Sequence, residues 1–268
     1  MNLAATSFDL DNARCCAALA DAAYGDDTQI IPGALSIKLI QGEQTDTQVL
    51  VVEFPEYISV NFCGTKNLKD ALTDVKIKRM PIAGGSAHVG FVQAILEAFP
   101  KLEAYLATLS TLKPLIITGH SLGGALAALF AYLWELRNRK YKPGALVPQS
   151  IAFVYTFGKP RVFGRLAQFS YNAALRSRTF RVVNCGDPVP LLPGLLIGYL
   201  HEGQEAFLSD TPVLHKVELR INPSRLWEIF NDSWDLYDDL KDRDWSALLA
   251  SEHHIEFYRT QLALACAA

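Results

Sequence analysis

A serine between two glycines is the residue of this sequence best placed to act as a nucleophile. The stretch "LIITGHSLGGALAALF" puts Ser121 in a G-x-S-x-G pattern, after a strand-like segment and before a helix-like apolar run. Gly119 and Gly123 lack a Cβ where a sharp strand-to-helix turn brings backbone segments together. Such a turn holds the serine side chain out of the fold, so we expect Ser121 to be a nucleophile. The alternative is a serine that only caps the following helix.

The helix predicted after the serine would supply hydrogen-bond donors for an oxyanion. The first N–H groups of a helix have no partner within it, and its N-terminus carries partial positive charge. The backbone N–H of Leu122, directly after the serine, is therefore the expected first donor of an oxyanion hole.

A serine hydroxyl becomes an effective nucleophile when a histidine takes its proton and a carboxylate orients that histidine. In a sheet of this type the expected chain order is Ser, then Asp or Glu, then His. Asp187 follows the strand-like segment 179–184 and would lie at the sheet edge that carries the serine turn, although an aspartate of an ordinary Pro/Gly turn is the alternative. His253 and His254 come late enough and sit at a loop-to-helix junction. The histidines expected to have no part in the chemistry are His88, His120, His201 and His215.

Strand-like and helix-like segments alternate along the chain that must position these residues. The helical segments are 9–24, 89–110, 122–140 and the C-terminal end. The strand-like segments are 35–40, 49–54, 57–62, 115–118, 151–157 and 179–184. The first three strands indicate an antiparallel meander, and the later order favours a mostly parallel sheet. No linker or repeat divides the chain, so we expect one α/β domain over residues 1–268.

Composition limits the class of partner. Half of the 268 residues are hydrophobic and the formal net charge is -3, with no basic stripe, so nucleic acid is not an expected partner. No run reaches the roughly 18 apolar residues of a membrane span. We expect no metal and no organic cofactor, and the five cysteines predict reduced thiols. The N-terminus lacks the features of a Sec signal peptide, which is compatible with the cytoplasm or with secretion by a leaderless route.

Four motifs occur in an order that resembles the class 3 lipase family, the α/β-hydrolase relatives of fungal triacylglycerol lipases. They are "GSAHVGF" (85–91), "GHSLGGA" (119–125), "TFGKPRV" (156–162) and "RVVNCGDPVPLLP" (181–193), and the similarity extends over residues 48–262. The resemblance implies an α/β-hydrolase fold, with a mostly parallel central sheet, antiparallel edge strands and helices on both faces. It also implies Ser121 as nucleophile and Asp187 as the acid of a catalytic triad.

The resemblance further bears on the histidine and on the second oxyanion donor. The segment "EHHIEFYRTQL" (252–262) is similar to the D-H-S-I-x-x-Y pattern of many bacterial and plant-like members, which selects His253. The H-x-x-Y/F spacing of fungal members would select His254, and we expect His253. The family's second oxyanion donor follows an early strand, which implies Thr65 in "VNFCGTKN". Here Cys63 stands where the family usually has Arg.

The chemistry implied is hydrolysis of carboxylic esters of lipids through an acyl-enzyme, by a triacylglycerol lipase or lipolytic carboxylesterase. The expected partners are a lipid ester substrate and, transiently, a lipid–water interface. Alternatives are a phospholipase A1 or galactolipase, a feruloyl-type esterase, and a catalytically silent lipid-binding module. Two segments are candidate lids, 66–81 and 223–250, and ordinary packing on the protein body is the alternative for each.

Overall fold

The computed structural model describes most of the chain. The described residues are 1–64, 78–140, 149–184, 186–194, 197–208, 214–215 and 253–265. Thr65 and the candidate lid segment 223–250 lie outside these ranges, as does the candidate lid segment 66–81 apart from residues 78–81. Within the described residues, no helix combines the length and the apolar character needed to cross a membrane.

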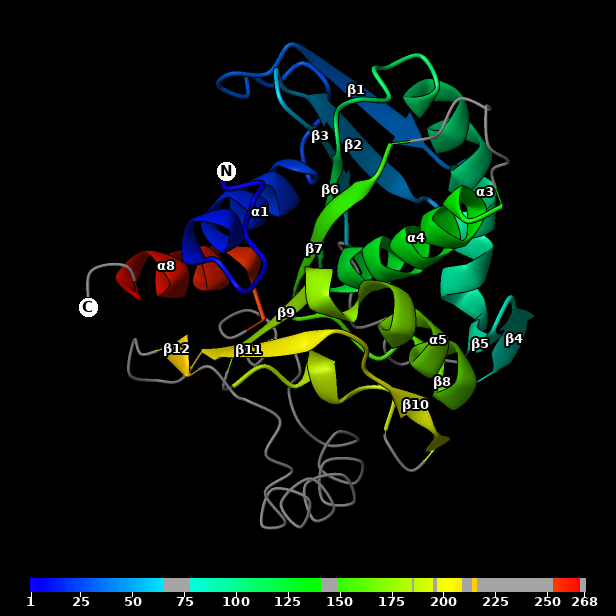
Figure 1. Ribbon diagram of the computed structural model, residues 1–268. Helices are drawn as coiled ribbons and strands as arrows, with labels where there is room; N and C mark the ends of the chain where they lie inside the picture. The colour runs from blue at the N-terminus through cyan, green and yellow to red at the C-terminus, as the bar shows by residue number, and fades with distance from the viewer. Residues whose placement is uncertain are drawn as a thin grey trace.

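An eight-stranded sheet lies at the centre of the described structure (Figure 1). Its strands, in spatial order, are β1 (Ser36–Gln41), β2 (Gln48–Glu53), β3 (Ile58–Phe62), β6 (Leu115–His120), β7 (Ile151–Phe157), β9 (Thr179–Asn184), β11 (Gln204–Leu208) and β12 (Leu214–His215). The pairs β1–β2, β2–β3 and β11–β12 are antiparallel. The pairs β3–β6, β6–β7, β7–β9 and β9–β11 are parallel. The predicted mostly parallel sheet with antiparallel edges is confirmed.

A second sheet of four short strands lies beside the first. Its order is β10 (Tyr199–Leu200), β8 (Phe163–Gly164), β5 (Gly85–His88) and β4 (Arg79–Ile82), and all three pairings are antiparallel. This sheet is not predicted from the sequence, because strands of two to four residues are too short to show alternation.

Helices cover both faces of the central sheet, as expected for an α/β-hydrolase. On one face, α1 (Leu10–Ala22) and α8 (Ile255–Leu264) pack side by side. On the other face lie α3 (Val89–Leu106) and α4 (Leu122–Asn138), and α5 (Arg165–Leu175) packs on the second sheet (Figure 1). The short 3₁₀ helix η1 (Arg176–Arg178) precedes β9, and the short 3₁₀ helix η2 (Val189–Leu191) follows it. Of these helices, α5, η1 and η2 were not predicted from the sequence.

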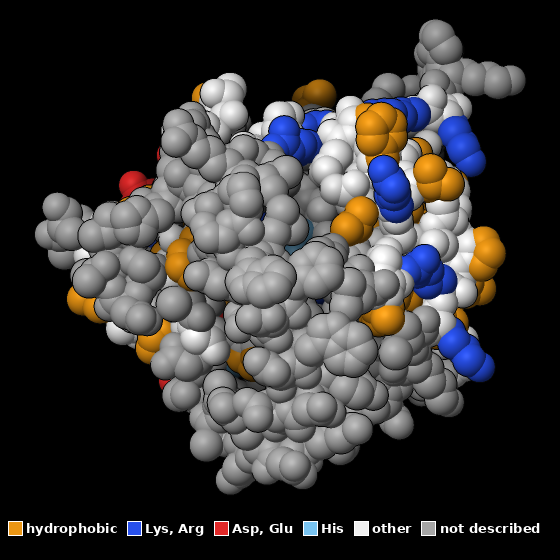
Figure 2. Space-filling model, turned by 90° about the horizontal axis from the view of Figure 1, so that it is seen from below, with side chains coloured by type: hydrophobic (Ala, Val, Ile, Leu, Met, Phe, Trp, Pro, Cys, Tyr) orange, Lys and Arg blue, Asp and Glu red, His pale blue; other side chains and the backbone are white. Residues whose placement is uncertain are grey.

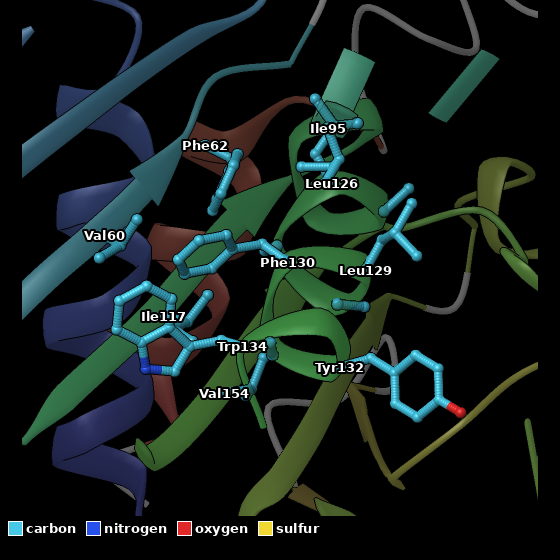
Figure 3. Close-up of a cluster of buried hydrophobic side chains, with 14 of the residues drawn as sticks. Val60, Phe62, Ile95, Ile117, Leu126, Leu129, Phe130, Tyr132, Trp134 and Val154 are labelled. Atoms are coloured by element: carbon cyan, nitrogen blue, oxygen red, sulfur yellow. The ribbon is translucent and has the colours of Figure 1, made fainter. Parts of the chain in front are cut away.

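The core fixes α4, the helix that begins directly after the serine. Ile117 of β6 faces the cluster that contains α3 and α4, whereas Ile116 faces the cluster that contains α1 and α8. Figure 3 shows Phe130 between Phe62 of β3 and Trp134, with ring centroids 5.4 and 5.5 Å from those two rings. The small residues of α4 let it lie close to the sheet, so its N-terminus has a defined position.

Candidate active site

Ser121 lies at the junction of β6 and α4 with a strained backbone. Its φ of 56° and ψ of -129° belong to a region that residues with a side chain rarely adopt. Its N–H donates to the carbonyl oxygen of Phe157 at 2.9 Å, which ties the turn to β7. The serine makes no helix-capping hydrogen bond, and its buried Oγ has no hydrogen-bond partner among the described residues. The alternative of a serine that only caps α4 is therefore excluded.

Three glycines allow the chain to close around this serine. A Cβ at Gly119 would collide with the backbone of Gly123, and a Cβ at Gly123 would collide with the backbone of Phe62. A Cβ at Gly64 would lie 3.4 Å from the Cβ of Ser121. The end of β3 and the start of α4 therefore meet at the serine, as the G-x-S-x-G pattern predicts.

Backbone donors for an oxyanion are expected where these two segments meet. Leu122 is the first residue of α4, so its N–H has no acceptor within the helix. Gly64, beside the serine, immediately precedes the predicted second donor Thr65, which lies outside the described residues.

Asp187 and His253 form a buried hydrogen-bonded pair. His253 Nδ1 lies 2.8 Å from Asp187 Oδ2, and the two side chains are 3% and 0% exposed. The hydroxyl of Tyr258 donates to the same Oδ2 at 2.6 Å, and the backbone N–H of Val189 donates to Oδ1 at 2.9 Å. Because an ionised carboxylate only accepts hydrogen bonds, Nδ1 carries the proton of the neutral ring. Nε2 of His253 is then the basic nitrogen, and it is buried without a hydrogen-bond partner among the described residues.

The sheet brings this pair to the end of its parallel strands that also carries the serine. β6, β7 and β9 run parallel, so Ser121, Gly158 and Asp187 all follow the carboxyl ends of neighbouring strands. Gly158 has a φ of +57°, and a Cβ there would lie 2.5 Å from Asp187 Oδ2 and 3.0 Å from the ring of His253. Glycine is required at this position both by its backbone conformation and by the close approach of the pair.

The two adjacent histidines occupy different environments. His253 is 2% exposed and reaches Asp187. His254 is exposed and precedes α8 without a side-chain capping bond. The structure thus brings His253, and not His254, to the carboxylate of Asp187, the acid predicted from the sequence.

His120, the residue before the serine, joins the serine turn to the loop of His253. Its Nε2 lies 2.6 Å from the backbone carbonyl oxygen of His253, and its Nδ1 lies 2.8 Å from the hydroxyl of Tyr24. A carbonyl oxygen only accepts, so Nε2 carries the proton and Nδ1 accepts from the tyrosine. Burial, followed by the nearby His253, lowers the pKa of His120 well below its usual value, so the ring is neutral. His120 and Tyr24 have no predicted part in the site, but their hydrogen bonds hold the histidine loop against the serine turn.

A buried ion pair lies next to Gly158 in the chain. Lys159 Nζ lies 2.9 Å from Glu202 Oε1, and both side chains are almost fully buried. Burial, the largest cause, lowers the pKa of Lys159 to about 8. His201 hydrogen-bonds through Nε2 to the carbonyl oxygen of Pro190 at 2.7 Å. Burial, followed by neighbouring cations, lowers the pKa of His201 well below its usual value. His201 is therefore a neutral histidine with a backbone partner, which agrees with the structural role expected for it.

The fold is that of an α/β-hydrolase, and Ser121, Asp187 and His253 follow one another in the chain order of that fold. The family model described as "Lipase (class 3)" matches residues 59–196. The chain belongs to the class 3 lipase family.

Curated relatives and solved structures agree with this family. The chain is 32% identical over 174 residues to a lipase of Rhizopus niveus, a match that covers 62% of this chain and 42% of the relative. It is 44% identical over 82 residues to the chloroplastic phospholipase A1-Igamma2 of Arabidopsis thaliana, covering 30% of this chain and 15% of the relative. The chain therefore spans less than half the length of these two relatives. A Rhizomucor miehei lipase propeptide complex is similar in structure, with a TM-score of 0.64, 25% identity, and coverage of 75% of this chain and 67% of that one.

The neutral histidines His120, which is buried, and His201, which is half-buried, predict a loss of stability in acid. Their folded-state pKa values are lowered, so below about pH 6.5 the unfolded chain binds protons that the folded protein does not. The free energy of unfolding is expected to fall as the pH drops below that value, by up to about 1.4 kcal/mol per pH unit for each histidine. Urea unfolding between about pH 8 and about pH 5 measures this slope.

His201→Gln keeps a donor for the carbonyl of Pro190 and is expected to reduce the slope by one bound proton. His254→Gln, at an exposed position, is the matched control. An unchanged slope in His201→Gln would mean that His201 takes up its proton in the folded protein.

Proposed function

We propose that the protein hydrolyses carboxylic esters of lipids, as a triacylglycerol lipase or lipolytic carboxylesterase. Ser121 is the nucleophile, His253 the general base and Asp187 the acid of the triad. The observation that carries this proposal is the Asp187–His253 pair, which lies at the same end of the sheet as Ser121. Neither the basic Nε2 of His253 nor the Oγ of Ser121, both buried, has a hydrogen-bond partner in the part of the chain that the structure describes. Buried polar atoms without partners cost about 1–3 kcal/mol each, so two of them on the predicted nucleophile and base, at one end of the sheet, support a site built to act on a substrate.

In the first step Ser121 Oγ attacks the ester carbonyl carbon while His253 Nε2 takes the hydroxyl proton. The ring then carries positive charge, which the buried carboxylate of Asp187 stabilises through Nδ1–H. Tyr258 and the N–H of Val189 hold the carboxylate in place, so the ring keeps the tautomer that leaves Nε2 free to accept.

The carbonyl oxygen becomes an oxyanion as the serine attacks. The N–H of Leu122, at the N-terminus of α4, is placed to stabilise it, and Thr65 is the proposed second donor. The carbon–oxygen bond of the ester then breaks, and the proton on Nε2 passes to the leaving alcohol. Water, deprotonated by the same Nε2, attacks the acyl-enzyme and releases the carboxylic acid together with the free serine.

Phospholipase A1 activity is a second candidate, supported by the similarity to the Arabidopsis phospholipase. The two activities use the same triad and differ in the head group that the site accepts. Product release from dispersed triacylglycerol and from phosphatidylcholine of the same acyl chains would separate them. Since both kinds of substrate gather at a lipid–water interface, we also propose transient contact with such an interface.

Ser121→Ala is expected to lower kcat on a chromogenic acyl ester by at least about 10⁴-fold, because no other group replaces the attacking Oγ. The same variant should lose covalent labelling by a fluorophosphonate probe. Ser177→Ala, at an exposed serine of η1, is the matched control and should keep both. Labelling or hydrolysis that survives in Ser121→Ala would show that another residue is the nucleophile.

The adjacent histidines give a second test within the same segment. His253→Ala should lower kcat by about the same factor as Ser121→Ala, because residues of one triad act as a unit. His254→Ala should stay within a few-fold of the unaltered protein, since its side chain is exposed and does not reach Asp187. The opposite ranking of the two variants would assign the base to His254.

A further inference from the structure

The second sheet and α5 form one surface that contains no acidic residue. Asp and Glu are absent from residues 78–96, 149–184 and 188–201, which include all four strands of the second sheet and α5. The whole chain carries more acidic than basic residues, 28 against 25. The charge on this surface is therefore segregated from that of the rest of the molecule. We call the outer side of the second sheet and α5, with residue Ile197, the α5 surface.

Basic side chains of the α5 surface reach the solvent. Arg79 and Arg165 are exposed, as are Lys78, directly before β4, and Arg176, directly after α5, which we include in the α5 surface. Figure 2 shows Lys and Arg interleaved with apolar side chains on the right of the face seen there, the side on which Figure 1 places α5, β4 and β5. Among the described residues, no carboxylate forms an ion pair with Lys78, Arg79 or Arg165.

Large apolar side chains accompany these cations. Leu166 and Phe169 are 71% and 73% exposed and lie three residues apart, on one side of α5. Ala167 is buried where α5 meets Gly85 of β5, so the packing of the helix itself turns Leu166 and Phe169 outward. Ile197, before β10, is 38% exposed, and its carbonyl oxygen accepts from Arg79.

Local stability does not account for Arg165. It is the first residue of α5, where the partial positive charge of the helix N-terminus favours an acid and disfavours a cation. A neutral residue at position 165 would relieve that repulsion. The benefit of Arg165 must therefore come from an interaction outside the helix.

We propose that the α5 surface docks the protein on an anionic lipid–water interface. Cations are attracted to the negative potential of such a surface, and the apolar side of α5 can bury between the head groups. A second copy of the chain is disfavoured as the occupant, because a symmetric contact would place the same cations against each other. This docking rests on the proposed hydrolysis of lipid esters. It extends that function by naming the surface of the protein that contacts the lipid and the charge that the lipid carries.

A short connection links the candidate active site to the second sheet. Asp187 is followed by η2 and then by β10, the edge strand of the second sheet. Arg161, just before β8, donates to the carbonyl oxygens of Leu191 and Pro193 and so fixes this connection to the second sheet. Docking through α5 would therefore bring lipid next to the segment that carries Asp187.

Vesicle binding tests the docking separately from hydrolysis. Co-sedimentation would use ether-linked phosphatidylcholine vesicles, which contain no ester to cleave, with and without ether-linked phosphatidylglycerol. The unaltered protein should bind the anionic vesicles more tightly, and added salt should weaken that binding. Arg165→Gln should weaken it about fivefold, which corresponds to one cation near the surface. Leu166→Ser/Phe169→Ser should weaken it by roughly tenfold or more, because the apolar contact is lost.

Matched controls place the same changes elsewhere on the molecule. Lys38→Gln removes an exposed cation from β1, and Ile30→Ser/Leu112→Ser removes two exposed apolar side chains outside the α5 surface. Neither control should change vesicle binding. Equal binding to both kinds of vesicle, or an equal loss in variants and controls, would overturn the proposal.

Two further readouts separate the remaining outcomes. If the unaltered protein is a dimer in size-exclusion chromatography with light scattering and Leu166→Ser/Phe169→Ser is a monomer, the α5 surface is a contact between copies and the lipid proposal is wrong. All variants should hydrolyse a dissolved short-chain ester at the rate of the unaltered protein, since none alters the candidate active site. An unaltered protein that binds anionic vesicles yet cleaves no ester would contradict the proposed hydrolysis and leave the docking supported.

Discussion

The carboxylate of Asp187 is buried, and the arrangement of the site depends on the hydrogen bonds that make this burial possible. A charged carboxylate is costly to remove from water unless donors surround it. Here the donors are His253 Nδ1, the Tyr258 hydroxyl and the N–H of Val189, which come from the start of the C-terminal helical segment and from η2. The same bonds fix α8 against the sheet and set the tautomer of His253. Stability and chemistry therefore use one set of contacts at this edge of the sheet.

The two ends of the described chain meet at this edge. α1 and α8 pack side by side (Figure 1). Tyr24, shortly after α1, hydrogen-bonds to His120, which in turn hydrogen-bonds to the backbone carbonyl of His253. The strained backbone of Ser121 costs stability, as do its Oγ and the Nε2 of His253, which have no hydrogen-bond partner among the described residues. The two cores on either side of the sheet offset that cost. A site that opposes local stability in this way needs a rigid frame around it, which the parallel strands and α4 provide.

The sequence predicted those parts of the fold and site that have a local signal. Glycines around Ser121 and β-branched runs revealed the turn and the central strands, and Asp187 and His253 followed from chain order and from the resemblance. The bond between Tyr24 and His120 joins residues 96 positions apart and leaves no mark in a periodic pattern. α5 was missed for a different reason. Its buried residues Ala167, Tyr171 and Leu175 do follow helical spacing. Leu166 and Phe169, which are large and apolar but exposed, obscure that stripe in the sequence, and their exposure is what directs attention to the surface of α5.

The most direct test of the account is a crystal structure of the protein after reaction with a fluorophosphonate. We expect phosphorus bonded to Ser121 Oγ, a phosphoryl oxygen accepting from the N–H of Leu122, and His253 Nε2 within hydrogen-bond distance of the adduct while Nδ1 stays on Asp187. An adduct on another residue, or an imidazole of His253 directed away from the bound phosphorus, would contradict the claim that these three side chains form one proton-transfer path.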